Sequence, residues 1–180
     1  APLEDCYRPD LFPGLEVAVK EFRTLGEELA NGGVDIIILE TMNSVIEIES
    51  CLKALQTIEK PIWIGLNLSN SDSLQSGESM ESAIEKINKF QVECLLLNCN
   101  SLDRTAAALE LISSCWSGRW GIYPNLGIGE PSPTGEINEL SSDQKFLETA
   151  KKAVELGADI LGGCCGSSPR HIRLLQKEFL

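Results

Sequence analysis

The sequence predicts an α/β protein of five strand–helix units, and three observations support this fold class. Short apolar runs alternate along the chain with longer amphipathic segments. Three of these runs follow nearly the same residues, Gly33-Val34-Asp35, Gln91-Val92-Glu93 and Gly157-Ala158-Asp159, which suit a helix end followed by a strand start. The runs are continuously apolar, which is typical of parallel strands covered on both faces. Strands and helices in alternation predict right-handed βαβ crossovers.

The expected elements follow from these patterns in chain order. Each apolar run is four to eight residues long and is bounded by Gly, Pro, Asn or a charged residue, as strands are. The expected strands cover residues 34–40, 62–68, 92–99, 120–123 and 159–162. Apolar residues recur at helical spacing in the remaining segments, and the expected helices cover residues 15–30, 44–58, 79–90, 102–115, 142–156 and 169–179.

Two architectures accommodate five such units. One is an open, doubly wound sheet, and the other is part of a TIM-type (β/α)8 barrel, which typically takes about 250 residues when complete. The 180 residues are enough for about five of the eight barrel units, and we expect them to form a single domain, 1–180. In both architectures the functional site lies at the carboxyl ends of the strands.

Composition and charge exclude several classes of protein. Hydrophobic residues make up 43% of the chain and charged residues 23%, which excludes a disordered or low-complexity protein. The longest apolar runs are far shorter than the roughly 20 residues of a membrane-spanning helix. A net charge of −12 without a basic stripe argues against binding to nucleic acid or to an anionic membrane surface. The seven cysteines are an odd number in mostly apolar surroundings, so we expect reduced thiols in the cytoplasm.

The expected strand ends carry polar and metal-binding side chains. Glu40 ends the first strand, Asn98 and Cys99 end the third, and Cys164 and Cys165 follow the fifth. Thiolates at three such positions suit a zinc ion whose fourth position stays open for substrate or water, which is the arrangement of a catalytic zinc. An acid at the end of an otherwise aliphatic strand predicts a substrate contact at Glu40.

The loop around the cysteine pair has residues that favour this use. Glycine permits unusual backbone angles, so Gly162, Gly163 and Gly166 would allow both sulfurs to turn to one side. Ser168 and Pro169 predict the N-cap and first residue of a helix, whose N-terminus would favour the thiolate form of the cysteines.

Other interpretations of these residues stay open at this point. The cysteine pair also suits a buried tight turn or a redox-active dithiol. We expect His171 to be a solvated residue in the first helical turn. The remaining cysteines are expected to be core or surface thiols; they are Cys6, Cys51, Cys94 and Cys115.

Several motifs resemble those of one enzyme family. The stretch Gly162-Gly163-Cys164-Cys165-Gly166, followed by Ser168-Pro169-Arg170-His171-Ile172, resembles the C-terminal signature of the zinc-dependent homocysteine S-methyltransferases. Asn98-Cys99 resembles the family's upstream ligand motif, and Leu39-Glu40-Thr41 and Tyr123-Pro124-Asn125 resemble family strand ends. The resemblance covers most of the chain, and the double-cysteine loop combined with a single upstream cysteine is a specific signal.

The resemblance implies a (β/α)8 barrel that carries a methyl group from a small donor to the sulfur of homocysteine, producing methionine. It implies that Cys99, Cys164 and Cys165 bind Zn2+ and that the homocysteine thiolate is the fourth ligand. Glu40 would then bind the homocysteine amino group, and Asn98 and Asn125 would add hydrogen bonds to the substrate. No general base is required on the protein, because a metal-bound thiol is already deprotonated.

The resemblance further implies that this chain is the C-terminal part of a barrel that lacks its first three units. Family members carry an aspartate- and glycine-rich motif on the first strand, which is absent here. Because an open barrel segment exposes strand edges, we expect a homo-oligomer or association with a missing N-terminal barrel portion. The alternative functions are an inactive or partner-dependent fragment and a thiol redox or metal-binding protein. The Gly- and Pro-rich loop 125–141 is expected to help select the methyl donor.

Overall fold

The computed structural model of the chain describes residues 2–128, 137 and 139–180. The strands are β1 (Ile37–Met42), β2 (Ile62–Leu66), β3 (Cys94–Ser101), β4 (Arg119–Asn125) and β5 (Ile160–Leu161). The helices are α1 (Leu15–Asn31), α2 (Val45–Leu55), α3 (Met80–Ile87), α4 (Leu102–Cys115), α5 (Asp143–Glu155) and α6 (Pro169–Phe179), and a short 3-10 helix, η1 (Pro9–Leu11), precedes α1.

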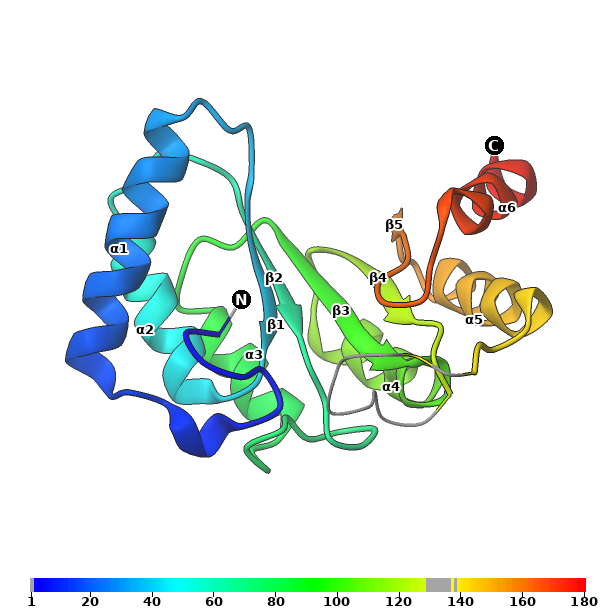
Figure 1. Cartoon of the computed structure of the whole chain (residues 1–180), viewed down its shortest axis with the longest axis horizontal. Coiled ribbons are helices and arrows are strands. Elements are labelled where there is room, and N and C mark those ends of the chain that lie inside the picture. Colours follow the sequence, from blue (N-terminus) through cyan, green and yellow to red (C-terminus); the bar gives the residue numbers. More distant parts are fainter. Residues whose placement is uncertain (1, 129–136, 138) are drawn as a thin grey trace. The chain divides into compact units, whose positions relative to one another are not determined.

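The order of the strands decides between the two expected architectures. The strands form one sheet in the order β1-β2-β3-β4-β5, and a helix lies between each strand and the next along the chain (Figure 1). Strand β1 pairs with β2, and β4 with β5, in parallel. A doubly wound sheet reverses its strand order at a switch point, whereas a barrel adds its strands in sequence. The fold is therefore the expected α/β class, with the topology of a partial barrel.

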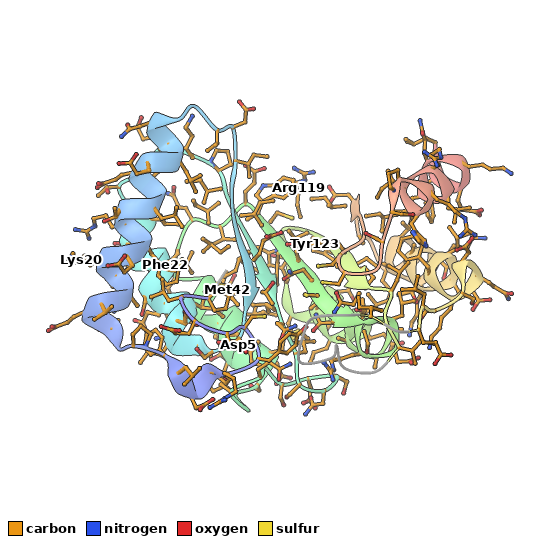
Figure 2. The ribbon with its side chains drawn as sticks, viewed as in Figure 1. Asp5, Lys20, Phe22, Met42, Arg119 and Tyr123 are labelled. Atoms are coloured by element: carbon orange, nitrogen blue, oxygen red, sulfur yellow. The ribbon has the colours of Figure 1, made fainter. Side chains whose placement is uncertain are left out.

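The chain divides into two compact units, residues 1–95 and 96–180. In the first unit α1 and α2 lie side by side (Figure 1). Phe22 is a buried residue of α1, whereas Lys20 on the same helix is exposed (Figure 2). Strand β1 alternates in the same way, because Ile37 and Leu39 are buried while Ile38 remains 40% exposed. The core of this unit therefore lies on one face of β1 and of α1.

Polar contacts hold the N-terminal segment of the first unit to the start of α2. The backbone N–H of Leu3 donates to the Glu47 carboxylate over 2.9 Å, and Nδ2 of Asn43 donates to the Cys6 carbonyl over 3.1 Å. Glu47 is only 3% exposed, and burial raises the pKa of its carboxyl group. A buried acid thus anchors the segment that leads into η1.

The second unit is built around a core between α4, α5 and α6. Helices α5 and α6 lie next to each other (Figure 1). Serine side chains cap two of its helices, since Ser101 accepts from Arg104 N–H at α4 and Ser142 accepts from Lys145 N–H at α5. The buried core residues are Leu102, Leu126, Phe146, Ala150 and Leu175.

The first strand differs from its expected bounds, and the cause is the end of α1. The Val34 N–H still donates to the Leu29 carbonyl of the helix, and Gly33 has a positive φ of 82°, so the chain is not yet extended there. Strand β1 consequently begins at Ile37 instead of Val34. It also continues beyond Glu40 to Met42, through a positive φ of 59° at Thr41.

The ends of the loop 125–141 are tied together by backbone hydrogen bonds. The Ser141 N–H donates to the Leu126 carbonyl over 2.7 Å, and the Ile128 N–H donates to the Glu139 carbonyl over 2.9 Å. Residues 129–136 and 138 lie outside the described residues, so the expected role of this loop in donor selection stays a prediction. Across the described part of the chain, no helix has both the length and the apolar character needed to cross a membrane.

Candidate metal site

The three cysteines predicted to bind metal lie together in the second unit. The Sγ atoms of Cys99 and Cys165 are 3.9 Å apart, and those of Cys164 and Cys165 are also 3.9 Å apart. All three sulfurs lie within 4.8 Å of one another. Three sulfurs bound to a tetrahedral zinc at about 2.3 Å would be about 3.8 Å from each other. The spacing therefore fits a zinc ion. Three thiols also suit zinc chemically, because thiolates are among its common ligands.

Exposure changes across the cluster in a way that matters for access. Cys99 is buried, Cys164 is half-buried and Cys165 is exposed. A metal held by these sulfurs would be shielded on the Cys99 side and reachable from solvent on the Cys165 side. Such access from solvent is required of a metal site that leaves one coordination position open to a substrate.

The loop that carries the cysteine pair is attached to β4 through its backbone. The Cys164 N–H donates to the Pro124 carbonyl over 2.8 Å, and the Leu126 N–H donates to the Cys165 carbonyl over 2.9 Å. The Ser167 N–H then donates to the Cys164 carbonyl over 3.0 Å and closes a turn. Both cysteines are thus fixed by main-chain hydrogen bonds that do not depend on a metal.

Two of the flanking glycines are required, for different reasons. A Cβ at Gly163 would lie 2.7 Å from Ser167 Cβ, so the turn closes only without a side chain there. Gly166 has a φ of +77°, which disfavours other residues. The expected left-handed backbone is therefore found at Gly166, whereas Gly163 is needed for close approach.

Asn125 joins the two segments that carry the three clustered cysteines. Cys99 has a positive φ of 58°, a conformation that costs a non-glycine residue roughly 1–3 kcal/mol. Nδ2 of Asn125 donates to the Cys99 carbonyl over 3.1 Å, and its Oδ1 accepts from the Cys165 N–H over 3.1 Å. Since the Asn125 residue is 8% exposed, one buried amide holds the strained Cys99 and the cysteine pair in register.

The protonation of the cysteines differs from the sequence-based expectation. The neighbouring Cys99 thiol and then burial raise the pKa of Cys164, and burial followed by the charge of Cys99 raises the pKa of Cys165. The net shift of both pKa values is upward, whereas the helix N-terminus alone was expected to favour the thiolate form. Three sulfurs this close repel one another as thiolates, and a bound cation would reverse that effect.

His171 is buried, so the expectation of a solvated residue is also wrong. It is 5% exposed, and its ring meets the edge of Phe146 with centroids 5.7 Å apart. The face of α6 that carries His171 also carries buried Leu175, one helical turn later, and packs on α5. The four-residue spacing between His171 and Leu175 therefore already indicated in the sequence that His171 lies on the buried face of the helix. His171 is not part of the thiol cluster.

The predicted substrate contacts fall in different parts of the chain. Asn98 is buried on β3 directly before Cys99, and Asn125 ends β4, so the second unit brings both to the strand ends that carry the thiols. Glu40 is exposed near the end of β1, in the first unit. The other four cysteines lie outside the cluster, as expected, and are Cys6, Cys51, Cys94 and Cys115.

The fold and the thiol cluster define a partial (β/α) barrel whose strand ends form a candidate three-cysteine metal site. The chain belongs to the Homocysteine S-methyltransferase family, whose sequence profile matches residues 2–179. The resemblance seen in the sequence motifs is thereby confirmed.

Individual relatives show the same family and the same partial coverage. Homocysteine S-methyltransferase 1 of Saccharomyces cerevisiae is 31% identical over 157 residues, an alignment that covers 79% of this chain and 47% of the yeast protein. Homocysteine S-methyltransferase 1 of Brassica oleracea var. italica is 24% identical over 156 residues and is covered to 48% of its length. The chain corresponds to the C-terminal part of these proteins and spans about half their length.

A solved structure supports the fold. The homocysteine methyltransferase MmuM from Escherichia coli, in its metallated form, superposes with a TM-score of 0.82 at 24% identity. The superposition covers 96% of this chain and 55% of the E. coli chain. The present chain thus has the fold of about half of a larger protein.

Proposed function

We propose that this chain forms the metal-binding part of a homocysteine S-methyltransferase that transfers a methyl group from a small donor to homocysteine and yields methionine. Cys99, Cys164 and Cys165 would hold Zn2+. When bound, the zinc would supply a positive charge that keeps the thiol of homocysteine, as fourth ligand, in its nucleophilic thiolate form.

The observation that carries this proposal is the arrangement of the three sulfurs. Two of the three sulfur–sulfur separations are 3.9 Å and all three lie within 4.8 Å, which fits a tetrahedral zinc–thiolate site, although the cysteines come from two segments 65 residues apart. Core thiols have no reason to converge at strand ends, where family sites lie. Three thiolates and one Zn2+ carry a net charge of −1, so a sulfur in the fourth position would remain electron-rich.

The chain's own residues have distinct tasks in this proposal. Cys165 faces solvent, so a substrate thiol would approach the cluster on that side. Asn125 holds the ligand segments, and Asn98 and Asn125 are proposed to contact homocysteine at the strand ends. Glu40 is proposed to pair with its amino group, because an ammonium ion favours a carboxylate partner.

A second candidate is a partner-dependent fragment that completes its barrel with a separate N-terminal portion or with a second copy. The chain spans about half of its relatives, and β1 carries the exposed apolar residue Ile38, flanked by exposed Ile36. Exposed apolar side chains on a strand at the edge of a sheet favour association with a further strand or chain. The candidate predicts metal binding without methyl transfer by the isolated chain.

Zinc titration of the reduced chain tests the proposed function. We expect one Zn2+ per chain, with loss of binding in Cys164→Ser and normal binding in Cys115→Ser, a half-buried cysteine outside the cluster. Zinc well below one per chain, or unchanged binding by Cys164→Ser, would contradict the proposal. Methionine formation from homocysteine and a methyl donor, with and without an N-terminal barrel portion, separates the two candidates.

A further inference from the structure

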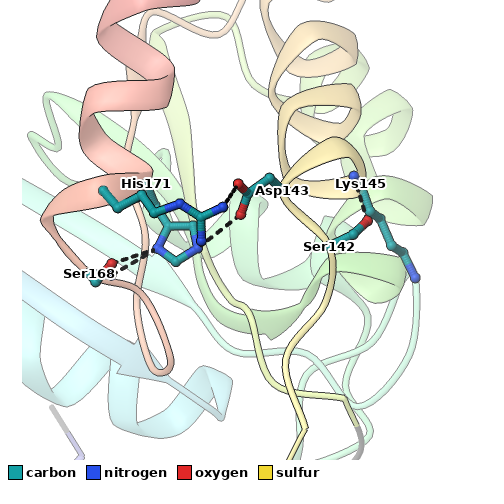
Figure 3. A network of polar contacts seen from close by, with 6 residues as sticks. Ser142, Asp143, Lys145, Ser168 and His171 are labelled. Carbon is teal, nitrogen blue, oxygen red and sulfur yellow. Dashed lines mark hydrogen bonds and ion pairs between the residues drawn. The ribbon is translucent and has the colours of Figure 1, made fainter.

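His171 lies at the start of α6 with its two ring nitrogens directed at different partners (Figure 3). Nδ1 is 3.0 Å from the backbone nitrogen of Ser168 and 3.2 Å from its Oγ. Nε2 is 3.6 Å from Oδ1 of Asp143, the first residue of α5. The other carboxylate oxygen of Asp143 pairs with the guanidinium group of Arg170. The ring therefore connects the beginnings of two neighbouring helices.

The backbone N–H of Ser168 determines which nitrogen of the His171 ring carries the hydrogen. A backbone N–H only donates, so Nδ1 accepts with its lone pair and the neutral ring carries its hydrogen on Nε2, toward Asp143. Because this lone pair is already engaged, it is not free to take a proton from the Ser168 hydroxyl. Ser168, His171 and Asp143 therefore do not form a nucleophilic triad, although their order resembles one.

The contact with Ser168 falls where the cysteine loop ends. Ser168 is the N-cap of α6, and the turn closed by Ser167 and Cys164 stands directly before it. On its other side the loop is attached to β4 through Cys164 and Cys165. The loop thus has two attachments, one along β4 and one at the His171 ring. The second attachment is a side chain packed on the core residue Phe146.

We propose that His171 is a positioning residue for the candidate metal site, holding the exit of the Cys164–Cys165 loop by accepting the Ser168 N–H. The proposal rests on the proposed function only in that the cysteine pair binds a metal. Residues outside the ligand set commonly change metal affinity by 10- to 100-fold when they fix ligand geometry. Here the effect passes through the main chain and not through a hydrogen bond to a sulfur.

Two substitutions at His171 distinguish loss of the hydrogen-bond acceptor from loss of side-chain volume. His171→Leu keeps an apolar side chain against Phe146 and removes the acceptor. His171→Gln keeps an acceptor, because glutamine at this third helical position reaches the N-cap N–H in capping boxes. Leu175→Ala is the matched control: it weakens the packing of the same helix, one turn later on the same face, and leaves the Ser168 contact intact.

Two measurements on the full 180-residue chain test the proposal. The first is Cd2+ affinity, followed by sulfur-to-cadmium absorbance in competition with a chelator. The second is the alkylation rate of Cys164 and Cys165 by iodoacetamide in the metal-free chain, relative to Cys115. We expect His171→Leu to bind Cd2+ about 10-fold more weakly and to be alkylated faster at the pair, with His171→Gln close to the parent chain in both.

The outcomes distinguish this proposal from a general loss of stability and from failure of the metal site. It is overturned if His171→Leu matches the parent chain in both measurements, if His171→Gln is as impaired as His171→Leu, or if Leu175→Ala weakens Cd2+ binding equally. Absence of Cd2+ binding by the parent chain would overturn the proposed function, while the alkylation rates would still test the loop attachment. If His171→Leu does not fold, His171→Met serves in its place.

Discussion

The two units of the chain use the same backbone device at a strand end but for different chemistry. In the first unit β1 passes through a positive φ of 59° at Thr41, and in the second β3 passes through a positive φ of 58° at Cys99. Both residues follow a predicted substrate contact, Glu40 and Asn98. The bend is thus shared by β1 and β3, and the thiol at Cys99 is what the second unit adds.

The thiols of the two units also differ, in burial and in their neighbours. Cys51 of the first unit is buried in α2, and burial raises its pKa to about 12, so it is an inert core residue. Cys164 of the second unit is half-buried, and a neighbouring thiol is the main cause of its raised pKa. Burial alone makes a cysteine unreactive, whereas clustering makes a group that a cation would deprotonate. Substitutions in the thiol cluster of the second unit should therefore change metal binding, and those in the first unit should change stability alone.

The largest expected effect separates two cysteines of the same strand. Cys99→Ala should weaken Zn2+ binding by roughly 100-fold or more, since even residues that only orient ligands account for 10- to 100-fold. Cys94→Ala, at a buried position of β3 outside the cluster, should retain the parent affinity and lose some stability. Competition with a chromophoric chelator measures both. Equal affinities in the two variants would remove Cys99 from the ligand set.

A smaller effect is expected from the buried amides. Asn125→Ala should weaken metal binding about 10-fold and reduce stability by about 1–3 kcal/mol, because it leaves the Cys165 N–H without its partner and releases the strained Cys99. Asn43→Ala in the first unit also removes a buried amide contact, to the Cys6 carbonyl. It should lower stability without changing metal affinity. The same loss of affinity in both variants would show that stability, and not local geometry, controls binding.

Glu47→Gln should stabilise the first unit at neutral pH. Burial raises the pKa of Glu47 in the folded chain, so the unfolded chain releases its proton first and stability falls as pH rises above the ordinary carboxyl range. Glutamine retains an acceptor for the Leu3 N–H and has no charge to bury. Denaturant unfolding at pH 4 and pH 7 should show a gain for the variant at pH 7 that is smaller at pH 4. A loss at pH 7 would mean that the charge itself is required.

The smallest effect is expected at Glu49. It pairs with Lys53 and Lys86 at 2.9 Å each, and these partners lower its pKa to about 2. Its stabilisation is therefore present above the ordinary carboxyl pKa and is lost as pH falls toward about 2. Because the group is partly exposed, Glu49→Gln should cost less than about 1 kcal/mol at pH 7, with metal affinity unchanged. A pH series of unfolding curves measures this; a difference that persists at pH 2 would contradict the ion-pair origin.

The sequence predicts the strands, the helices and the clustering of three thiols well because their signals are local. Apolar runs mark the strands, and the residues around Cys164 and Cys165 combine ligands, glycines and a helix start within a few positions. The role of Asn125 is not local, since its partners are the main-chain groups of Cys99 and Cys165 from other segments. Raised thiol pKa values likewise arise from side chains that meet only in the folded chain. The burial of His171 was accessible from its helical spacing to Leu175.

X-ray absorption at the zinc edge tests the central claim most directly, by counting sulfur ligands before and after homocysteine is added to the zinc-loaded chain. We expect three sulfurs at about 2.3 Å in the absence of homocysteine and four in its presence. A count below three without homocysteine would contradict the assignment of Cys99, Cys164 and Cys165. A count that stays at three while zinc remains bound and homocysteine is saturating would contradict its proposed place as the fourth ligand.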